Sequence, residues 1–178
     1  KYLNSPETEI FNKRKTLYGM HIARGTRRKE FILCEGYMDV ISMHQAGFDN
    51  TVASLGTALT AENVEVLKNY RKPVLLSYDS DHAGIDATLK AIRLFKGAGI
   101  PCRVINMKPY KDPDEFMKVL GAEEYEKRIA SAENSFLFEI RMMMREYDLT
   151  DPQQKTAFQV AMADRVIQNF PIEMERNN

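Results

Sequence analysis

Residues 31–39 read FILCEGYMD, and this stretch decides the fold of the chain. Four residues suited to a buried strand, 31–34, run directly into Glu35 and Gly36. A short apolar run that stops at a carboxylate and a glycine is typical of a parallel strand whose carboxyl end holds a ligand site in an open α/β sheet. We therefore expect residues 31–34 to form a buried parallel strand with Glu35 at its carboxyl end.

Two later apolar runs also lead into acidic loops. Residues 73–78 (PVLLSY) precede Asp79, Asp81, His82 and Gly84, and residues 103–107 (RVINM) precede Lys111, Asp112 and Asp114. The carboxyl ends of parallel strands meet at one edge of a sheet. We therefore expect these acids to lie close to Glu35.

Strand and helix patterns alternate from residue 31 to Gly121. Apolar runs predict strands at 31–34, 50–53, 73–78 and 101–107, and amphipathic spacing predicts helices at 39–46, 61–70, 83–96 and from Phe116. This alternation predicts an α/β fold, a parallel four-stranded sheet with flanking helices joined by right-handed crossovers. Residues 122–147 and 151–170 have helical periodicity without a strong strand candidate, so a C-terminal helical subdomain follows.

We therefore expect three segments, a basic segment at 1–29, the sheet domain at 30–121 and the helical subdomain at 122–178. The first contains eight basic and two acidic residues, and its residues 16–23 have the spacing of a short helix. It is either a solvated linker or an electropositive surface that holds phosphates beside the acids. Because the chain starts at Lys1 inside a loop-like sequence, we expect a fragment of a longer protein.

Composition limits the function classes. The 178 residues include 25 basic and 25 acidic residues, and 44% are hydrophobic, which is enough for a core. No window approaches the ~18 apolar residues of a membrane span, and no signal-peptide pattern opens the chain. Cys34 and Cys102 lack the spacing of metal ligands, so we expect reduced core cysteines of a cytoplasmic protein and no zinc site.

The acids at the strand ends indicate a metal site. Two carboxylates about 4 Å apart repel each other by about 4 kcal/mol at an effective dielectric of 20, so a cluster must be offset. Oxygen ligands without histidine or cysteine favour Mg²⁺, for which Mn²⁺ can substitute. Such a site predicts phosphoryl or nucleotidyl transfer, or phosphodiester cleavage. In the structural alternative, Asp39 and Asp114 only cap helices, while His82 and Lys111 are only solvated.

Two groups of motifs resemble known families. EGYMD at 35–39 followed by DSDHAG at 79–84 resembles the Toprim signature. Residues 1–8 (KYLNSPET), with Phe11, Lys13 and LYG at 17–19, resemble the segment that precedes the Toprim fold in bacterial DNA primase. SLGT at 54–57 and DPDE at 112–115 are also similar to primase. The chain is thus identified as similar to the catalytic core of that family, with residues 1–29 ending its N-terminal subdomain.

The resemblance implies a DNA-directed RNA polymerase that makes short RNA primers at the replication fork, in the nucleoid. It implies Glu35, Asp79 and Asp81 as catalytic and metal-site acids, with Asp39, Asp112 and Asp114 completing the metal surface. The implied nucleotide- and nucleic-acid-binding residues are Lys1, Asn4, Lys13, Gly36, Ser54, Gly56, Thr57, His82, Gly84 and Lys111. The implied partners are single-stranded DNA, ribonucleoside triphosphates, the RNA primer, a replicative helicase bound through a further domain, and inhibitors of the guanosine tetraphosphate type.

Other functions remain open on the sequence. A topoisomerase needs a tyrosine nucleophile, and none of the eight tyrosines has a context that marks it out. A Toprim-type nuclease would use the same acids for hydrolysis, against which the primase-like residues 1–19 argue. A third alternative is a module without catalytic activity that binds a nucleotide or a metal ion, or that docks onto another protein.

Overall fold

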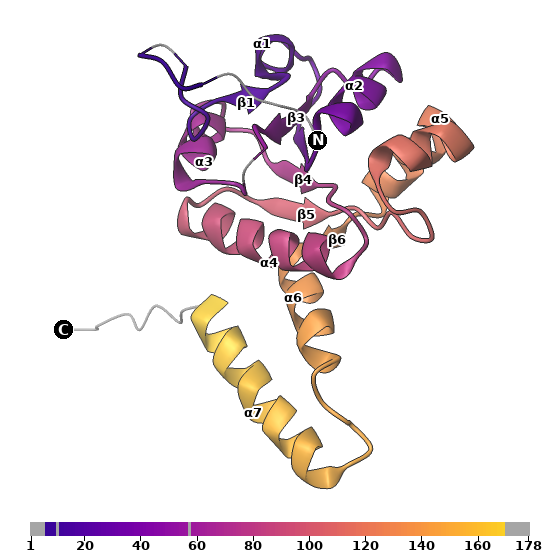
Figure 1. The fold of residues 1–178 in the computed structure, drawn as a ribbon. Coiled ribbons are helices and arrows are strands. Elements are labelled where there is room, and N and C mark those ends of the chain that lie inside the picture. The colour runs from indigo at the N-terminus through magenta and orange to yellow at the C-terminus, as the bar shows by residue number, and fades with distance from the viewer. Residues whose placement is uncertain (1–5, 10, 57, 170–178) are drawn as a thin grey trace, which may run out of the picture. The chain divides into compact units, whose positions relative to one another are not determined.

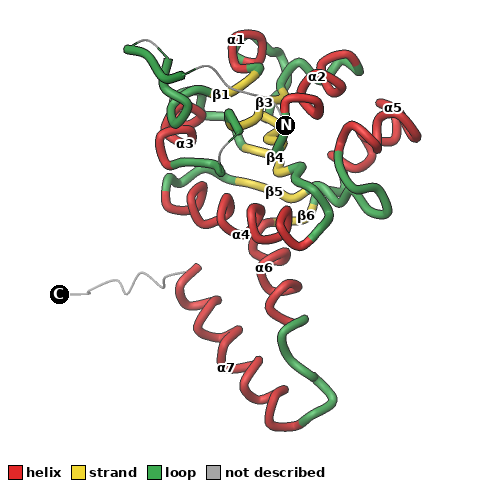
Figure 2. Tube along the Cα trace, viewed as in Figure 1, coloured by secondary structure: helices red, strands yellow, loops and turns green. Residues whose placement is uncertain are grey.

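The computed structural model describes residues 6–9, 11–56 and 58–169. Within them, six strands form one sheet in the order β1-β3-β2-β4-β5-β6 (Figures 1 and 2). The four central strands are parallel: β2 (Phe31–Cys34), β3 (Thr51–Ser54), β4 (Val74–Leu76) and β5 (Cys102–Val104). The parallel four-stranded sheet expected from the apolar runs is thereby confirmed.

Two short edge strands extend this sheet beyond the prediction. β1 (Leu17–Tyr18) pairs antiparallel with β3, and β6 (Glu133–Asn134) pairs antiparallel with β5. Of the helix expected at residues 16–23, only the second half is helical, as α1 (Met20–Ala23). The reason is Gly19, whose φ of 81° breaks a continuous helix and whose missing Cβ would lie 2.8 Å from the Thr51 carbonyl oxygen. Two-residue strands are too short to show a period of two, so both escaped prediction.

Four longer helices flank the sheet: α2 (Tyr37–Gln45), α3 (Ala61–Lys68), α4 (His82–Gly97) and α5 (Pro113–Ala130). α2 packs against α5 and α3 packs against α4, so the two pairs flank the sheet (Figure 1). The start of α3 was correctly expected, since the Thr60 hydroxyl accepts a hydrogen bond from the Asn63 N–H at 3.1 Å.

One part of the core lies between the sheet and the pair formed by α2 and α5, and further buried core residues come from α3 and α4. Phe48 and Phe116 each pack edge-on against Tyr125, with ring centroids 5.0 and 5.6 Å apart. The Tyr125 hydroxyl donates to Ser77 Oγ at 2.8 Å, so this buried ring is also tied to the end of β4. Tyr125 follows the kink of α5 at Gly121, and the boundary expected between residues 121 and 122 therefore falls inside α5.

The chain divides into two compact units, one ending at Asn134 and the other starting at Ser135. The second unit contains α6 (Ser135–Met144) and α7 (Pro152–Asn169), and the rings of Tyr147 and Phe158 pack 5.7 Å apart within it. Asp151 precedes α7 and accepts from the Gln153 N–H at 3.0 Å. The helical pattern after Gly121 is confirmed for these segments.

Two smaller expectations concern membranes and cysteines. In the described ranges, no helix combines the length and the apolar character that crossing a bilayer requires. Cys34 and Cys102 are both buried, in β2 and β5, as expected from their apolar neighbours.

Candidate metal and nucleotide site

The sheet changes its winding direction between β2 and β4. The chain passes from β2 to β3 on one side, whereas it passes from β4 to β5 on the other. Open α/β folds place their ligand sites beyond the carboxyl ends of the strands at such a point, because the loops there run apart. Glu35 directly follows β2 and Asp79 closely follows β4, so these two acids occupy this position.

Glu35 and Asp79 are in direct contact. The Asp79 N–H donates to Glu35 Oε1 at 3.2 Å, and both carboxylates are half-buried. Burial and the charge of Asp79 raise the pKa of Glu35 above its usual value. Burial and the charge of Asp112 raise the pKa of Asp79 in the same direction. The strand ends therefore concentrate negative charge that the protein itself offsets only in part.

Asp39 ties two helices together at this edge. It is 7% exposed, accepts from the Gly36 N–H at 3.1 Å, and accepts from the Asp114 N–H at 3.4 Å. Burial raises its pKa to about 7, with smaller contributions from the charges of Asp112 and Asp79. The side chain thus caps the start of α2, as the structural alternative supposed, and also lies within the electrostatic field of the acidic edge.

The other predicted acids serve partly as helix caps. Asp81 Oδ1 accepts from the Gly84 N–H at 2.9 Å and caps α4, while Asp112 Oδ1 accepts from the Glu115 N–H at 2.8 Å and caps α5. Asp114 forms an ion pair with Lys118. Among the residues that the structure describes, no group of three or more His, Cys, Asp or Glu side chains is arranged to hold a metal ion. The acids lie near one another, but within the described residues they do not form a complete metal-binding site by themselves.

The two loops that carry the acids are joined to each other. The Ser80 N–H donates to the Lys111 carbonyl at 2.8 Å, and the Ser80 hydroxyl donates to the Tyr110 carbonyl at 2.9 Å. Lys111 Nζ lies 3.8 Å from Asp79 Oδ2. Gly84 is needed for packing at this point, since an added Cβ would lie 2.1 Å from the Asp79 carbonyl oxygen. The loop after β4 therefore has its position fixed from both sides.

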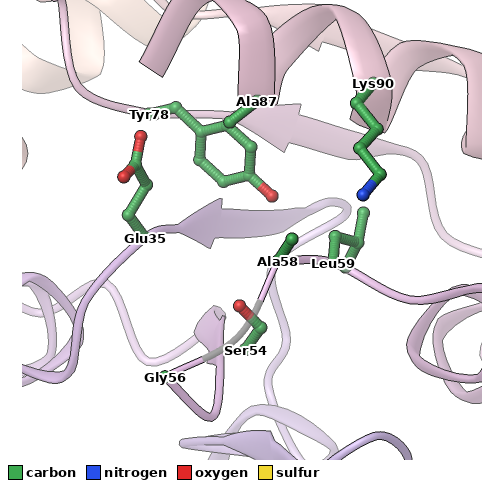
Figure 3. Close-up of a pocket in the computed structure, with 8 residues that line it drawn as sticks. All are labelled: Glu35, Ser54, Gly56, Ala58, Leu59, Tyr78, Ala87 and Lys90. Carbon is green, nitrogen blue, oxygen red and sulfur yellow. The ribbon is translucent and has the colours of Figure 1, made fainter. Parts of the chain in front are cut away.

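A pocket of about 330 Å³ opens beside Glu35. It is lined by residues from the ends of β2, β3 and β4 and from α4 (Figure 3): Glu35, Ser54, Gly56, Ala58, Leu59, Tyr78, Ala87 and Lys90. Ser54 and Gly56 were expected near the site, whereas Tyr78 and Lys90 were not. The sequence did contain a signal, because Ala87 and Lys90 are three positions apart and therefore share one face of α4.

The remaining predicted residues lie at various distances from this centre. Gly36 is next to Glu35, and His82 is exposed at the first position of α4. Lys13 is half-exposed, and its N–H donates to Glu7 at 3.1 Å. Residues 24–29 precede β2 and so lie at the opposite end of that strand from Glu35. That part of the basic segment does not border the acids. Lys1, Asn4 and Thr57 lie outside the described residues.

The chain is similar to two families in consecutive segments. Residues 32–117 match a family described as Toprim-like, and residues 1–24 match the N-terminal domain of the DNA primase catalytic core. A DNA primase of Clostridium acetobutylicum is 38% identical over 98% of this chain and 30% of its own length. The chain therefore spans less than a third of that relative.

Solved structures give the same result for the fold. A DnaG primase catalytic domain bound to single-stranded DNA matches with a TM-score of 0.80 and 33% identity, over 94% of this chain and 56% of that one. A DNA primase domain from Pseudomonas aeruginosa matches with a TM-score of 0.81 and 32% identity, over 96% and 55% of the two chains. The chain spans somewhat more than half of each.

Proposed function

The chain belongs to the bacterial DNA primases, as a fragment of their catalytic core, and from this premise we propose that it carries the acidic part of a primer-synthesis site. That site joins ribonucleotides into a short RNA on single-stranded DNA. The observation that carries the proposal is the contact between Glu35 and Asp79 at the point where the sheet changes its winding direction.

The residues present suit a hard divalent cation, Mg²⁺ or Mn²⁺. The side chains that gather at this edge offer carboxylate oxygens, and burial, with the charges of neighbouring acids, raises the pKa of Glu35 and of Asp79. Magnesium sites at phosphates commonly use only one or two carboxylates together with phosphate oxygens. The proposed ligands are one or two of the principal acids Glu35, Asp79 and Asp81, with Asp39, Asp112 and Asp114 as supporting acids. When bound, the ion neutralises charge that develops on the phosphates during nucleotidyl transfer.

The chain's own residues orient this centre. The Asp79 N–H fixes one oxygen of Glu35, and the Ser80 contacts hold the loop of Asp79 against the loop of Asp112. Lys111 Nζ lies 3.8 Å from Asp79 Oδ2. From this position Lys111 would form an ion pair with a phosphate that enters between the two loops. These hydrogen bonds hold the acids in position before the nucleotide arrives, which lowers the entropic cost of the reaction.

The proposed partners follow from the family. They are a single-stranded DNA template, ribonucleoside triphosphates and the growing RNA, with Lys1, Asn4 and Lys13 contributing to nucleotide binding. A replicative helicase would bind through another part of the full-length primase, and nucleotides of the guanosine tetraphosphate type would compete at the same surface. The proposed location is the cytoplasm, at the replication fork.

Primer synthesis tests the proposal in the full-length primase that contains this chain. Glu35→Gln removes a charge and keeps the shape, so we expect primer yield from ribonucleoside triphosphates to fall at least about 100-fold with an unchanged circular dichroism spectrum. Glu146→Gln, at an exposed position after α6, is the matched charge control and is expected to retain full yield. A Glu35→Gln protein that makes normal amounts of primer would remove Glu35 from the mechanism.

A further inference from the structure

The pocket beside Glu35 has two chemically different ends. Glu35 contributes a carboxylate at one end, and Lys90 contributes an ammonium group at the other (Figure 3). The ring of Tyr78 lies between them in the view of Figure 3, and its hydroxyl points toward the Lys90 end. Ala58, Leu59 and Ala87 supply apolar surface around these groups.

Both hydrogen-bond donors at the Lys90 end are unused within the described part of the chain. Lys111 and Lys118, at the acidic edge, each form an ion pair with an aspartate. Lys90 has no such ion pair there, and the Tyr78 hydroxyl makes no hydrogen bond there. A tyrosine hydroxyl and a lysine ammonium both donate, so together they suit a ligand with acceptor oxygens.

We propose that this pocket binds the terminal phosphates of a nucleoside triphosphate, with Lys90 as the charged donor and Tyr78 as the neutral donor. The inference rests on the proposed function, because it starts from a reacting phosphate held at Glu35 and Asp79. Glu35 and Lys90 line the same pocket, so the rest of the polyphosphate chain would extend past the Tyr78 ring toward Lys90. Lys90 is exposed, so its ammonium group is accessible to a phosphate that enters from solvent.

The size and the charges of the pocket agree with this ligand. A volume of about 330 Å³ is at the small end of ligand sites and suits a polyphosphate group. Glu35 alone would repel a phosphate, so entry requires a counter-charge, which a bound cation supplies at one end and Lys90 at the other. The competing occupant is the nucleoside half of the molecule, with its base against the Tyr78 ring.

Binding measurements on the 178-residue chain distinguish these two occupants. Affinities for ATP, AMP and inorganic tripolyphosphate are measured by calorimetry in the presence of Mn²⁺, for the wild-type chain and for Lys90→Met. We expect the variant to bind ATP and tripolyphosphate about tenfold more weakly and AMP with less than about twofold change. Tyr78→Phe keeps the ring and should weaken the same two ligands by a few-fold. Lys90→Arg should retain most of the affinity.

Lys96→Met is the matched control, because it removes the same charge from an exposed position later in α4. The pocket assignment is overturned if Lys90→Met leaves ATP affinity unchanged. It is equally overturned if AMP affinity falls as much as ATP affinity, which would place the nucleoside in the pocket. A wild-type chain that binds none of the three ligands with Mn²⁺ would instead contradict the proposed function itself.

Discussion

Asp39 is a nearly buried carboxylate that faces other acids. Its pKa is about 7 in the folded chain because burial and the charges of Asp112 and Asp79 oppose ionisation, whereas an unfolded aspartate titrates near 4. Between these two values the folded state binds more protons than the unfolded state. Folding stability contributed by this group is therefore complete at low pH and is lost as the pH rises toward and through 7.

Asp39→Asn tests this coupling, since asparagine resembles the protonated acid. We expect the metal-free variant to lose less stability than the wild type between pH 5 and pH 8, by about 2–3 kcal/mol. Urea unfolding at several pH values measures the difference. Asp164→Asn, at an exposed position in α7, should leave the wild-type pH dependence as it is. If the free energy of unfolding depends on pH in the same way for Asp39→Asn and for the wild type, Asp39 ionises normally in the folded chain.

At the residue scale, the sequence predicted the acids better than it predicted their surroundings. Glu35 and Asp79 meet because two parallel strands end beside each other, and the apolar runs that form those strands are visible in the sequence. Lys90 was missed because its role depends on how α4 is rotated relative to the loop after β3, which no local pattern specifies. Hydrophobic periodicity indicates which face of a helix is buried, but it does not indicate what the opposite face approaches.

The helix α5 contributes a large buried aromatic ring to the core. Its second half carries Tyr125, which contacts two phenylalanine rings and donates to Ser77. Tyr125→Ala should therefore cost about 3–5 kcal/mol of unfolding free energy, as large-to-small changes of buried aromatic residues do. Val119→Ala, at a position of α5 that is 59% exposed, should change it by less than about 0.5 kcal/mol. Equal urea midpoints for the two variants would contradict a core role for this part of α5.

The elements themselves were predictable where they are long and regular. The four parallel strands appear as short apolar runs and the helices after them have amphipathic spacing. The boundary placed after Gly121 relied on a glycine as a stop signal. In the structure this glycine has φ 74° and ψ −175°, which is not helical, so it ends one helical segment and a second begins directly after the kink, within α5.

For the whole molecule, a divalent cation should act as a stabilising ligand. An ion that binds only the folded chain raises its melting temperature by mass action. We expect saturating Mn²⁺ to raise the melting temperature by several degrees, corresponding to about 2–3 kcal/mol. Asp79→Asn combined with Asp81→Asn should abolish the increase, which differential scanning fluorimetry measures.

The control for this experiment replaces two exposed acids of α5, Glu123 and Glu126, with glutamine. That variant should respond to Mn²⁺ like the wild type. An undiminished response in the aspartate double variant would place the ion elsewhere on the molecule.

The two short outer strands, β1 and β6, also affect how the molecule behaves among its own copies. A bare four-stranded parallel sheet exposes unpaired N–H and C=O groups along both borders, and such borders recruit strands from other chains into aggregates. Here each border is occupied by a two-residue antiparallel segment, too brief to serve as a good template for another chain. The same few residues that periodicity overlooked thus protect the sheet against self-association at high concentration.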